Sequence, residues 1–164
     1  MKIFKASLDS VAWITTISVS VVFLYCLSLL IRQWNVSGNG KYFVFLIPVI
    51  YLMAWALRPV NYRVTSSELI VYRVLNSVHI SLNSIVSAEM IDSSRISWSV
   101  RTFGVGGLFG YYGRFRNADL GPMVWYATRR DQPVLIRTLQ NQQIILTPDE
   151  PAQFLEAIRN NSRS

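Results

Sequence analysis

The sequence has 164 residues, enough for roughly one domain with short attachments. Hydrophobic residues make up 51% of it and charged residues only 15%, against about 25% charged residues in an ordinary soluble domain. This deficit indicates that part of the chain is not in water, and the apolar content excludes a disordered chain. The single Cys excludes an intramolecular disulfide, and the single His excludes a histidine metal cluster.

Two long uncharged runs near the N-terminus predict membrane-spanning helices. Residues 11–31 are 21 residues without a charge, which as a helix would extend about 31 Å, the thickness of a bilayer core. Residues 42–57 form a second run of 16, at the short end for a span. Between them, residues 32–41 contain the Gly, Asn and Ser that favour a turn. We therefore expect residues 1–58 to form a transmembrane helical hairpin.

Two other interpretations of the first run stay open. A cleaved signal peptide has an apolar stretch of about 7 to 15 residues followed by a small-residue cleavage site, and the first run departs from both features. A buried hairpin in a soluble core is the second alternative. Two uncharged runs of this length would be unusual inside so small a domain.

Positive charges near the two runs predict their orientation, because cytoplasmic flanks are enriched in Lys and Arg. Five such residues flank the hairpin on the outside and two lie in its loop. The outer ones are Lys2, Lys5, Arg58, Arg63 and Arg73, and those in the loop are Arg32 and Lys41. This bias favours a multi-pass protein with both termini in the cytoplasm.

From about residue 60 the pattern changes to short strands. Val78, Ile80 and Leu82 alternate with polar neighbours, a period of two that is typical of a half-buried strand. The strand candidates are residues 60–64, 68–73, 78–82, 85–91, 98–103, 123–128, 133–138 and 143–146. Residues 123–128 and 133–138 flank a turn, and 143–146 follows a second turn. Some seven short antiparallel strands in this length predict a small all-β barrel or sandwich.

One helix is predicted to end the chain. Asp149 is a good N-cap residue, and Pro151 follows in the first turn, where its missing N–H has no cost. Phe154, Leu155 and Ile158 share one face of this helix. We expect that face to close the open end of the barrel.

Two segments give the chain a family resemblance. They are the glycine-rich segment 106–121 (GGLFGYYGRFRNADLG), with the strand that follows it, and the ending 146–158 (LTPDEPAQFLEAI). With two N-terminal spans ahead of them, they resemble the bacterial pleckstrin-homology (PH)-like membrane proteins. The resemblance implies a seven-stranded barrel with a C-terminal capping helix over residues 59–164. It also implies a bacterial cell (inner) membrane location.

The glycines between residues 104 and 113 do not fit a dinucleotide-binding fingerprint. That motif needs G-x-G-x-x-G between a strand and a helix, and Phe109 occupies the place of its third glycine. A twisted or bulged hairpin, in which glycine permits positive φ and aromatic residues pack across the strands, explains the segment better.

Arginines supply the candidate binding site. Residues 58–164 contain 12 basic and 8 acidic side chains, a net charge of +4, and every basic one is Arg. Arginine suits bidentate contact with phosphate, and a basic face beside a bilayer attracts anionic lipid headgroups. Solvation and the positive-inside bias alone are the alternative explanation. The candidate residues for lipid or partner binding are Arg101, Arg114, Arg116, Arg129 and Arg130, with Phe109, Tyr111 and Tyr112.

The remaining side chains indicate a non-enzymatic protein. His79 has no second His or nearby Cys, the carboxylates are scattered, and no G-x-S-x-G motif is present. We therefore expect no catalytic residue, cofactor, metal or nucleic-acid partner. The leading hypothesis is a membrane-anchored PH-like module that binds a lipid headgroup, a membrane-protein partner or another copy of itself. The alternative is a subunit of a membrane transport or export complex in which the spans are the functional part.

Overall fold

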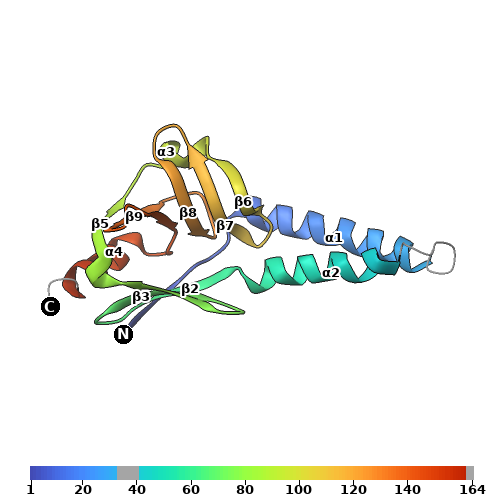
Figure 1. The fold of residues 1–164 in the computed structure, drawn as a ribbon, viewed down its shortest axis with the longest axis horizontal. Coiled ribbons are helices and arrows are strands. Elements are labelled where there is room, and N and C mark those ends of the chain that lie inside the picture. Colours follow the sequence, from blue (N-terminus) through green and yellow to red (C-terminus); the bar gives the residue numbers. More distant parts are fainter. Residues whose placement is uncertain (33–40, 162–164) are drawn as a thin grey trace.

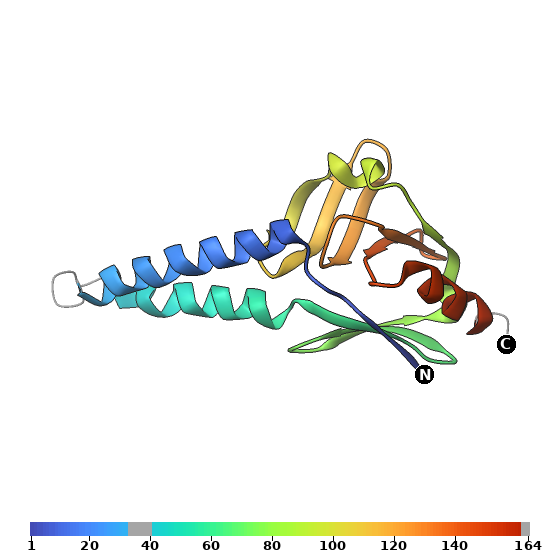
Figure 2. The same ribbon diagram turned by 180° about the vertical axis from the view of Figure 1, so that it is seen from behind.

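The structure, a computed structural model, describes residues 1–32 and 41–161. Two helices project side by side from one end of a β-rich domain, and the N-terminus and the last described helix lie on the domain, away from the two projecting helices (Figure 1). The view from behind shows the same arrangement, with the N-terminal segment crossing the domain before the first helix begins (Figure 2).

The two helices are α1 (Ser10–Arg32) and α2 (Lys41–Ala56). They pack against each other through Tyr51, whose ring stacks on Phe23 at 4.5 Å between centroids and whose hydroxyl lies 2.6 Å from the Ser20 hydroxyl. Most of their large apolar side chains, such as Ile14, Leu24 and Ile50, are exposed. The predicted helical hairpin is therefore present, while most of its predicted turn, residues 33–40, lies outside the described residues.

Only one of the two predicted spans is supported. Among the described residues, one helix, Ser10–Arg32, is long and apolar enough to cross a membrane, with a length of about 35 Å. α2 has 16 residues and extends about 24 Å, so it is shorter than a typical bilayer core. Its apolar part, Phe45–Ala56, counts as a shorter apolar helix.

A four-stranded sheet begins with a strand that precedes the helices. Its strands are β1 (Lys2–Lys5), β2 (Pro59–Val64), β3 (Glu68–Arg73) and β4 (Ser77–Ser81), in the order β1-β2-β3-β4. β1 pairs antiparallel with β2, with Phe4 opposite Tyr62. The helical hairpin is thus inserted between two neighbouring strands of one sheet. β1 was not predicted, because four residues are too few to show a period of two.

A six-stranded sheet forms the rest of the domain. After the short helix η1 (Leu82–Ser84) come β5 (Ile85–Met90), the short helix α3 (Ser94–Ser97), β6 (Val100–Gly107), β7 (Gly110–Asn117), β8 (Gly121–Ala127), β9 (Val134–Thr138) and β10 (Gln143–Leu146). Their order in the sheet is β5-β9-β10-β8-β7-β6. β10 is antiparallel to β9 and parallel to β8.

This topology corrects the predicted barrel. The described residues form ten strands in two sheets rather than about seven, the sheets do not join into a closed barrel, and one pair of strands is parallel. The strands at 123–128 and 133–138 are not partners, because β10 lies between them. Alternation in a sequence indicates that a segment is a strand but not which strand it pairs with. The order and pairing of the strands could therefore not be predicted from it.

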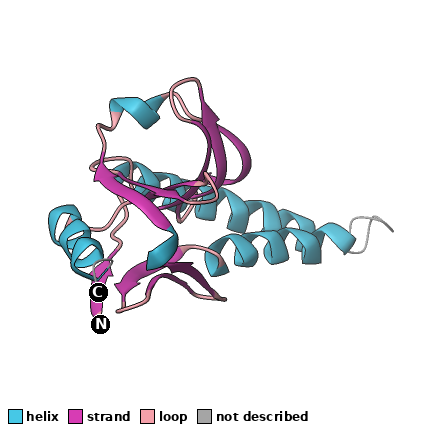
Figure 3. Cartoon of the chain, turned by 60° about the vertical axis from the view of Figure 1, so that its left-hand side comes forward, coloured by secondary structure: helices cyan, strands magenta, loops and turns pink. Residues whose placement is uncertain are grey.

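Two clusters of buried side chains hold the sheets in place. The first lies between the two sheets and the C-terminal helix α4 (Pro151–Asn161), which contributes Phe154, Leu155 and Ile158. This confirms the predicted apolar face of that helix. The second lies on the other face of the six-stranded sheet, where Trp125 stacks on Phe115 at 4.3 Å and Ala12 of α1 joins the cluster. Figure 3 shows the two sheets with α4 beside them.

The predicted N-cap, Asp149, has another role. Helix α4 begins at Pro151, so Asp149 lies one residue too early to be its cap. Its carboxylate instead accepts hydrogen bonds from the Ser7 backbone N–H (3.0 Å) and hydroxyl (2.6 Å) and lies 3.5 Å from the Arg129 guanidinium. Burial alone would raise the pKa of Asp149, but the bonds from Ser7, together with Arg129, outweigh it and lower that pKa. Asp149 therefore ties the segment before α1 to the domain.

Tyr62 supplies a prediction for alkaline pH. It is fully buried, its hydroxyl donates to the Tyr126 carbonyl at 2.6 Å, and burial raises its pKa from 10.0 to about 12. The contribution of this shift to the free energy of unfolding is fully present below pH 10, where Tyr62 keeps its proton in both the folded and the unfolded protein. It is lost as the pH rises toward 12. We expect Tyr62→Phe to cost about 1 kcal/mol at neutral pH and to flatten the alkaline loss of stability. Urea unfolding of the full chain in detergent across this pH range would test it, and an equally steep loss in both proteins would contradict it.

Candidate functional site

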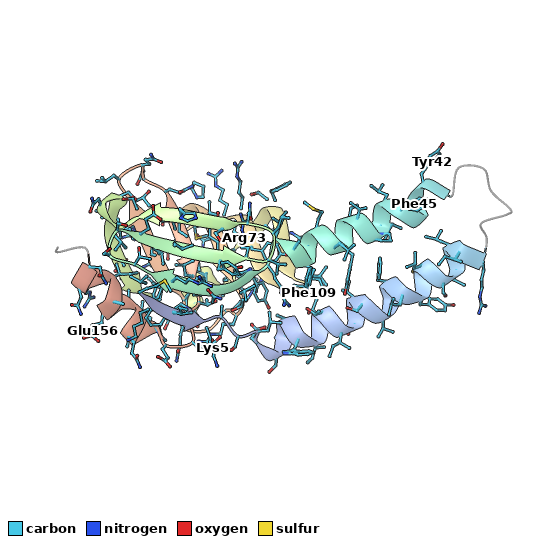
Figure 4. All side chains as sticks on the ribbon, turned by 90° about the horizontal axis from the view of Figure 1, so that it is seen from below. Lys5, Tyr42, Phe45, Arg73, Phe109 and Glu156 are labelled. Atoms are coloured by element: carbon cyan, nitrogen blue, oxygen red, sulfur yellow. The ribbon has the colours of Figure 1, made fainter. Side chains whose placement is uncertain are left out.

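The β6–β7 hairpin contacts the base of the helices through its tip. The Phe109 backbone N–H donates to the Thr16 hydroxyl at 2.9 Å, and the Phe109 ring lies 5.3 Å from that of Tyr51. The Tyr112 hydroxyl donates to the Ala54 carbonyl, and burial raises the pKa of this tyrosine. Phe109 lies at the junction between domain and helices in Figure 4. The hairpin thus holds both helices at a defined place on the domain.

Glycines make the shape of this hairpin possible. Gly104 and Gly113 lie opposite each other with φ of +109° and +121°, and a Cβ on either would come within 2.3 Å of a carbonyl oxygen of the facing strand. The register also shifts between Arg101 and Phe103. The prediction of a bulged hairpin with positive φ at its glycines is confirmed.

Next to the helices, this hairpin exposes a mixed apolar and cationic surface. On β6, the strand of its sheet nearest to α1 (Figure 1), Val100 lies opposite Arg116 and Phe103 opposite Arg114. Directly opposed residues of an antiparallel pair share one face of the sheet. We call Val100, Phe103, Arg114 and Arg116 the arginine face. All four are exposed, and neither arginine has an ion pair with a residue that the structure describes.

The pairing also explains why this face is exposed. A row of opposed residues runs across the sheet from Phe103 through Arg114, Val124 and Ile144 to Ile136. Ile136 and Ile144 are buried beneath the four-stranded sheet, whereas Phe103 at the other end is 76% exposed. The arginine face is the part of the inner surface that the shorter sheet does not cover. A cavity of about 570 Å³ lies beside it, lined by both arginines and Gln143.

Comparison with known families identifies the β-rich domain. A family model described as a bacterial PH domain matches residues 60–162, more than half of the chain. The chain belongs to the bacterial PH domain family. No curated protein and no solved structure was found to match it. PH domains are generally non-catalytic, and this membership suggests a binding or scaffolding module. The match begins after α2, so β1 and the hairpin lie outside it although β1 completes the sheet.

The PH domain uses the five candidate arginines differently. Arg114 and Arg116 lie on the arginine face, and Arg101, also exposed, lies on β6. Arg129 is largely buried, donates to the Pro148 carbonyl at 2.9 Å and lies 3.5 Å from both Asp131 and Asp149. Arg130 lies over the Tyr111 ring at 4.7 Å from its centroid. The structure therefore does not bring the five together in one cluster.

The three aromatic candidates are buried in the PH domain. Phe109, Tyr111 and Tyr112 are 7%, 2% and 5% exposed, and they pack at the helix base or in the second cluster. Two aromatics of this part of the domain that are strongly exposed are instead Phe103 and, just before β6, Trp98, which is 90% exposed. The sequence did not single these out, because an alternating strand looks the same whether or not another layer covers its face.

The described residues also bear on metal binding and on His79. No group of three or more His, Cys, Asp or Glu side chains among them could hold a metal ion. His79 is exposed and its Nδ1 lies 2.9 Å from a carboxylate oxygen of Glu68 on the neighbouring strand. His79 and Glu68 therefore form an exposed pair of side chains on the surface of the four-stranded sheet.

Proposed function

We propose that this protein is a membrane-anchored, non-enzymatic PH module whose arginine face binds anionic phospholipid headgroups at the cytoplasmic leaflet. The observation that carries the proposal is the pair Arg114 and Arg116, which are exposed and without ion pairs among the described residues, beside exposed Phe103 on the strand nearest the helices. Guanidinium groups suit phosphate, and aromatic side chains favour the membrane interface.

The position of β1 supports a membrane hairpin made of both helices. β1 precedes α1 and pairs with β2, which follows α2, so the two ends of the hairpin lie on the same side of any bilayer. If α1 crosses, the chain must cross back before β2, and α2 is the described helix between them. Its shortfall in length is met by local thinning of the bilayer at modest cost.

The same pairing supports an anchor over a cleaved signal peptide. Cleavage after α1 would remove β1, the edge strand of the four-stranded sheet, together with Ser7, which holds Asp149. The excess of Lys and Arg outside the hairpin supports a cytoplasmic domain.

Cysteine labelling tests the two crossings. In a Cys26→Ser background, Ser37→Cys marks the segment between the helices and Ser66→Cys marks the exposed turn between β2 and β3. With a membrane-impermeant maleimide, we expect position 66 to react only from the cytoplasmic side and position 37 only from the opposite side. Reaction of both positions from the same side would contradict the two crossings.

Lipid-dependent contact of the arginine face has a separate test. Trp98→Cys in the same background carries an environment-sensitive fluorophore, and the full chain is placed in nanodiscs of phosphatidylcholine with or without phosphatidylglycerol. We expect blue-shifted emission only with phosphatidylglycerol, reversed by raised salt because the attraction is electrostatic. Identical emission in both membranes would contradict the proposal.

A further inference from the structure

A second cavity opens where the helices leave the domain, apart from the arginine face. It has a volume of about 430 Å³, within the range of small-molecule sites. Its walls are Val19 and Phe23 of α1, Ile50 and Tyr51 of α2, and Val105 of β6, and no carboxylate lines it. We call this cavity the interhelical groove.

The groove runs along the helices rather than across them. On α1 its lining extends from Thr15 to Phe23, about 12 Å along the axis, and on α2 it extends from Ala54 back to Ile47. Both runs start near the domain and lead away from it. The Phe23–Tyr51 stack joins the two walls. In a membrane, the groove would lead from the headgroup level into the hydrocarbon.

A single arginine lies at the domain end of this groove. Arg101 lines it, and its Nη1 is 3.5 Å from the place that a Cβ on Gly106 would take, so the guanidinium lies over this glycine. Arg101 has no ion pair among the residues that the structure describes. An unpaired cation at the end of an apolar groove is complementary to an amphiphile with an anionic head.

We infer that the interhelical groove binds one anionic phospholipid, with an acyl chain between α1 and α2 and the phosphate on Arg101. Each methylene that enters the groove exchanges its contacts with solvent or mobile lipid for close packing against the helices. The Arg101 guanidinium makes a bidentate contact with the phosphate. The inference rests on the proposed insertion of the helices in a bilayer, but it uses none of the residues of the arginine face.

Native mass spectrometry of the full chain in neutral detergent tests it, with phosphatidylglycerol and phosphatidylcholine of identical chains as probes. We expect one retained phosphatidylglycerol per chain. Val19→Trp fills the groove and should weaken retention by roughly tenfold or more, the equivalent of excluding two methylenes. Val21→Trp, at an exposed α1 position outside the lining, should leave retention unchanged. Equal retention by both variants would overturn the inference.

Arg101→Gln is the second variant, since it leaves the packing of the helices intact. We expect it to abolish the preference for phosphatidylglycerol over phosphatidylcholine while an adduct persists, and soluble glycerol phosphate should not compete. An unchanged preference would overturn the role of Arg101. Replacing Arg114 and Arg116 should leave the single adduct in place, so failure of the arginine face and failure of the groove give different results.

Discussion

Replacing Gly113 with alanine is expected to destabilise the protein by about 3 kcal/mol or more. The new Cβ would lie 2.3 Å from the Phe103 carbonyl oxygen, at a φ of +121° that side-chain-bearing residues rarely adopt. The nearest atoms that this Cβ would meet, in Phe103 and Gly104, all belong to the backbone and not to a flexible side chain, so the β6–β7 pairing itself must shift. Because the tip of this hairpin holds both helices, we also expect the helices to lose their fixed place on the domain.

Gly106→Ala is the matched control for this substitution. Gly106 lies on the same hairpin, its φ is not in the left-handed region, and a Cβ there would meet only Arg101 at ordinary contact distance. Urea unfolding of both variants and the parent chain in detergent should separate them, with Gly106→Ala within about 1 kcal/mol of the parent. Similar losses in the two variants would show that the close approach at Gly113 is not the cause.

The double substitution Arg114→Gln and Arg116→Gln is expected to weaken binding of phosphatidylglycerol at the arginine face by roughly thirtyfold. Each arginine near an anionic surface contributes about 1 kcal/mol, and about 2 kcal/mol together correspond to that factor. Titration of phosphatidylglycerol into neutral detergent micelles, followed by the fluorophore at position 98, gives the apparent affinity. The difference from the parent chain should shrink as salt is raised.

Two other arginines, both half-buried at the surface, provide the charge-matched control. Arg95 binds the Asp119 carboxylate at 2.8 Å, and Arg137 lies 3.3 Å from the Glu89 carboxylate. The double substitution Arg95→Gln and Arg137→Gln therefore also removes two positive charges, but at positions away from the arginine face. We expect a much smaller loss of affinity from this pair. Equal losses would mean that net charge, and not the arginine face, attracts the lipid.

Several elements followed from local sequence alone. The apolar runs identified both helices, and short apolar segments next to turn residues located β3 and β10 with the same bounds as the structure. The glycine-rich segment predicted a bulged hairpin, because positive φ is a property of single residues and their neighbours. The apolar face of α4 was equally local, since residues three and four apart lie on one side of a helix.

The candidate site was only partly predictable. Arginine suggested phosphate chemistry, but composition does not reveal which guanidinium is already paired. Arg129 is committed to Asp131, Asp149 and a carbonyl, whereas Arg114 has no ion pair among the described residues. The sequence also did not show that the aromatic candidates are buried. Their burial depends on contacts with residues far away in the chain, such as those between the tip of the hairpin and the helices.

The sequence by itself determined that two apolar helices precede a strand-rich domain, because hydropathy and periodicity are properties of adjacent residues. Tertiary structure alone decided that β1 pairs with β2, which follows the helical hairpin in the sequence, and that β10 lies between β8 and β9. It also decided that the inner face of β6 and β7 is left uncovered. Each of these depends on contacts between residues distant in the chain, and such contacts are selected by the packing of the whole domain rather than by local preference.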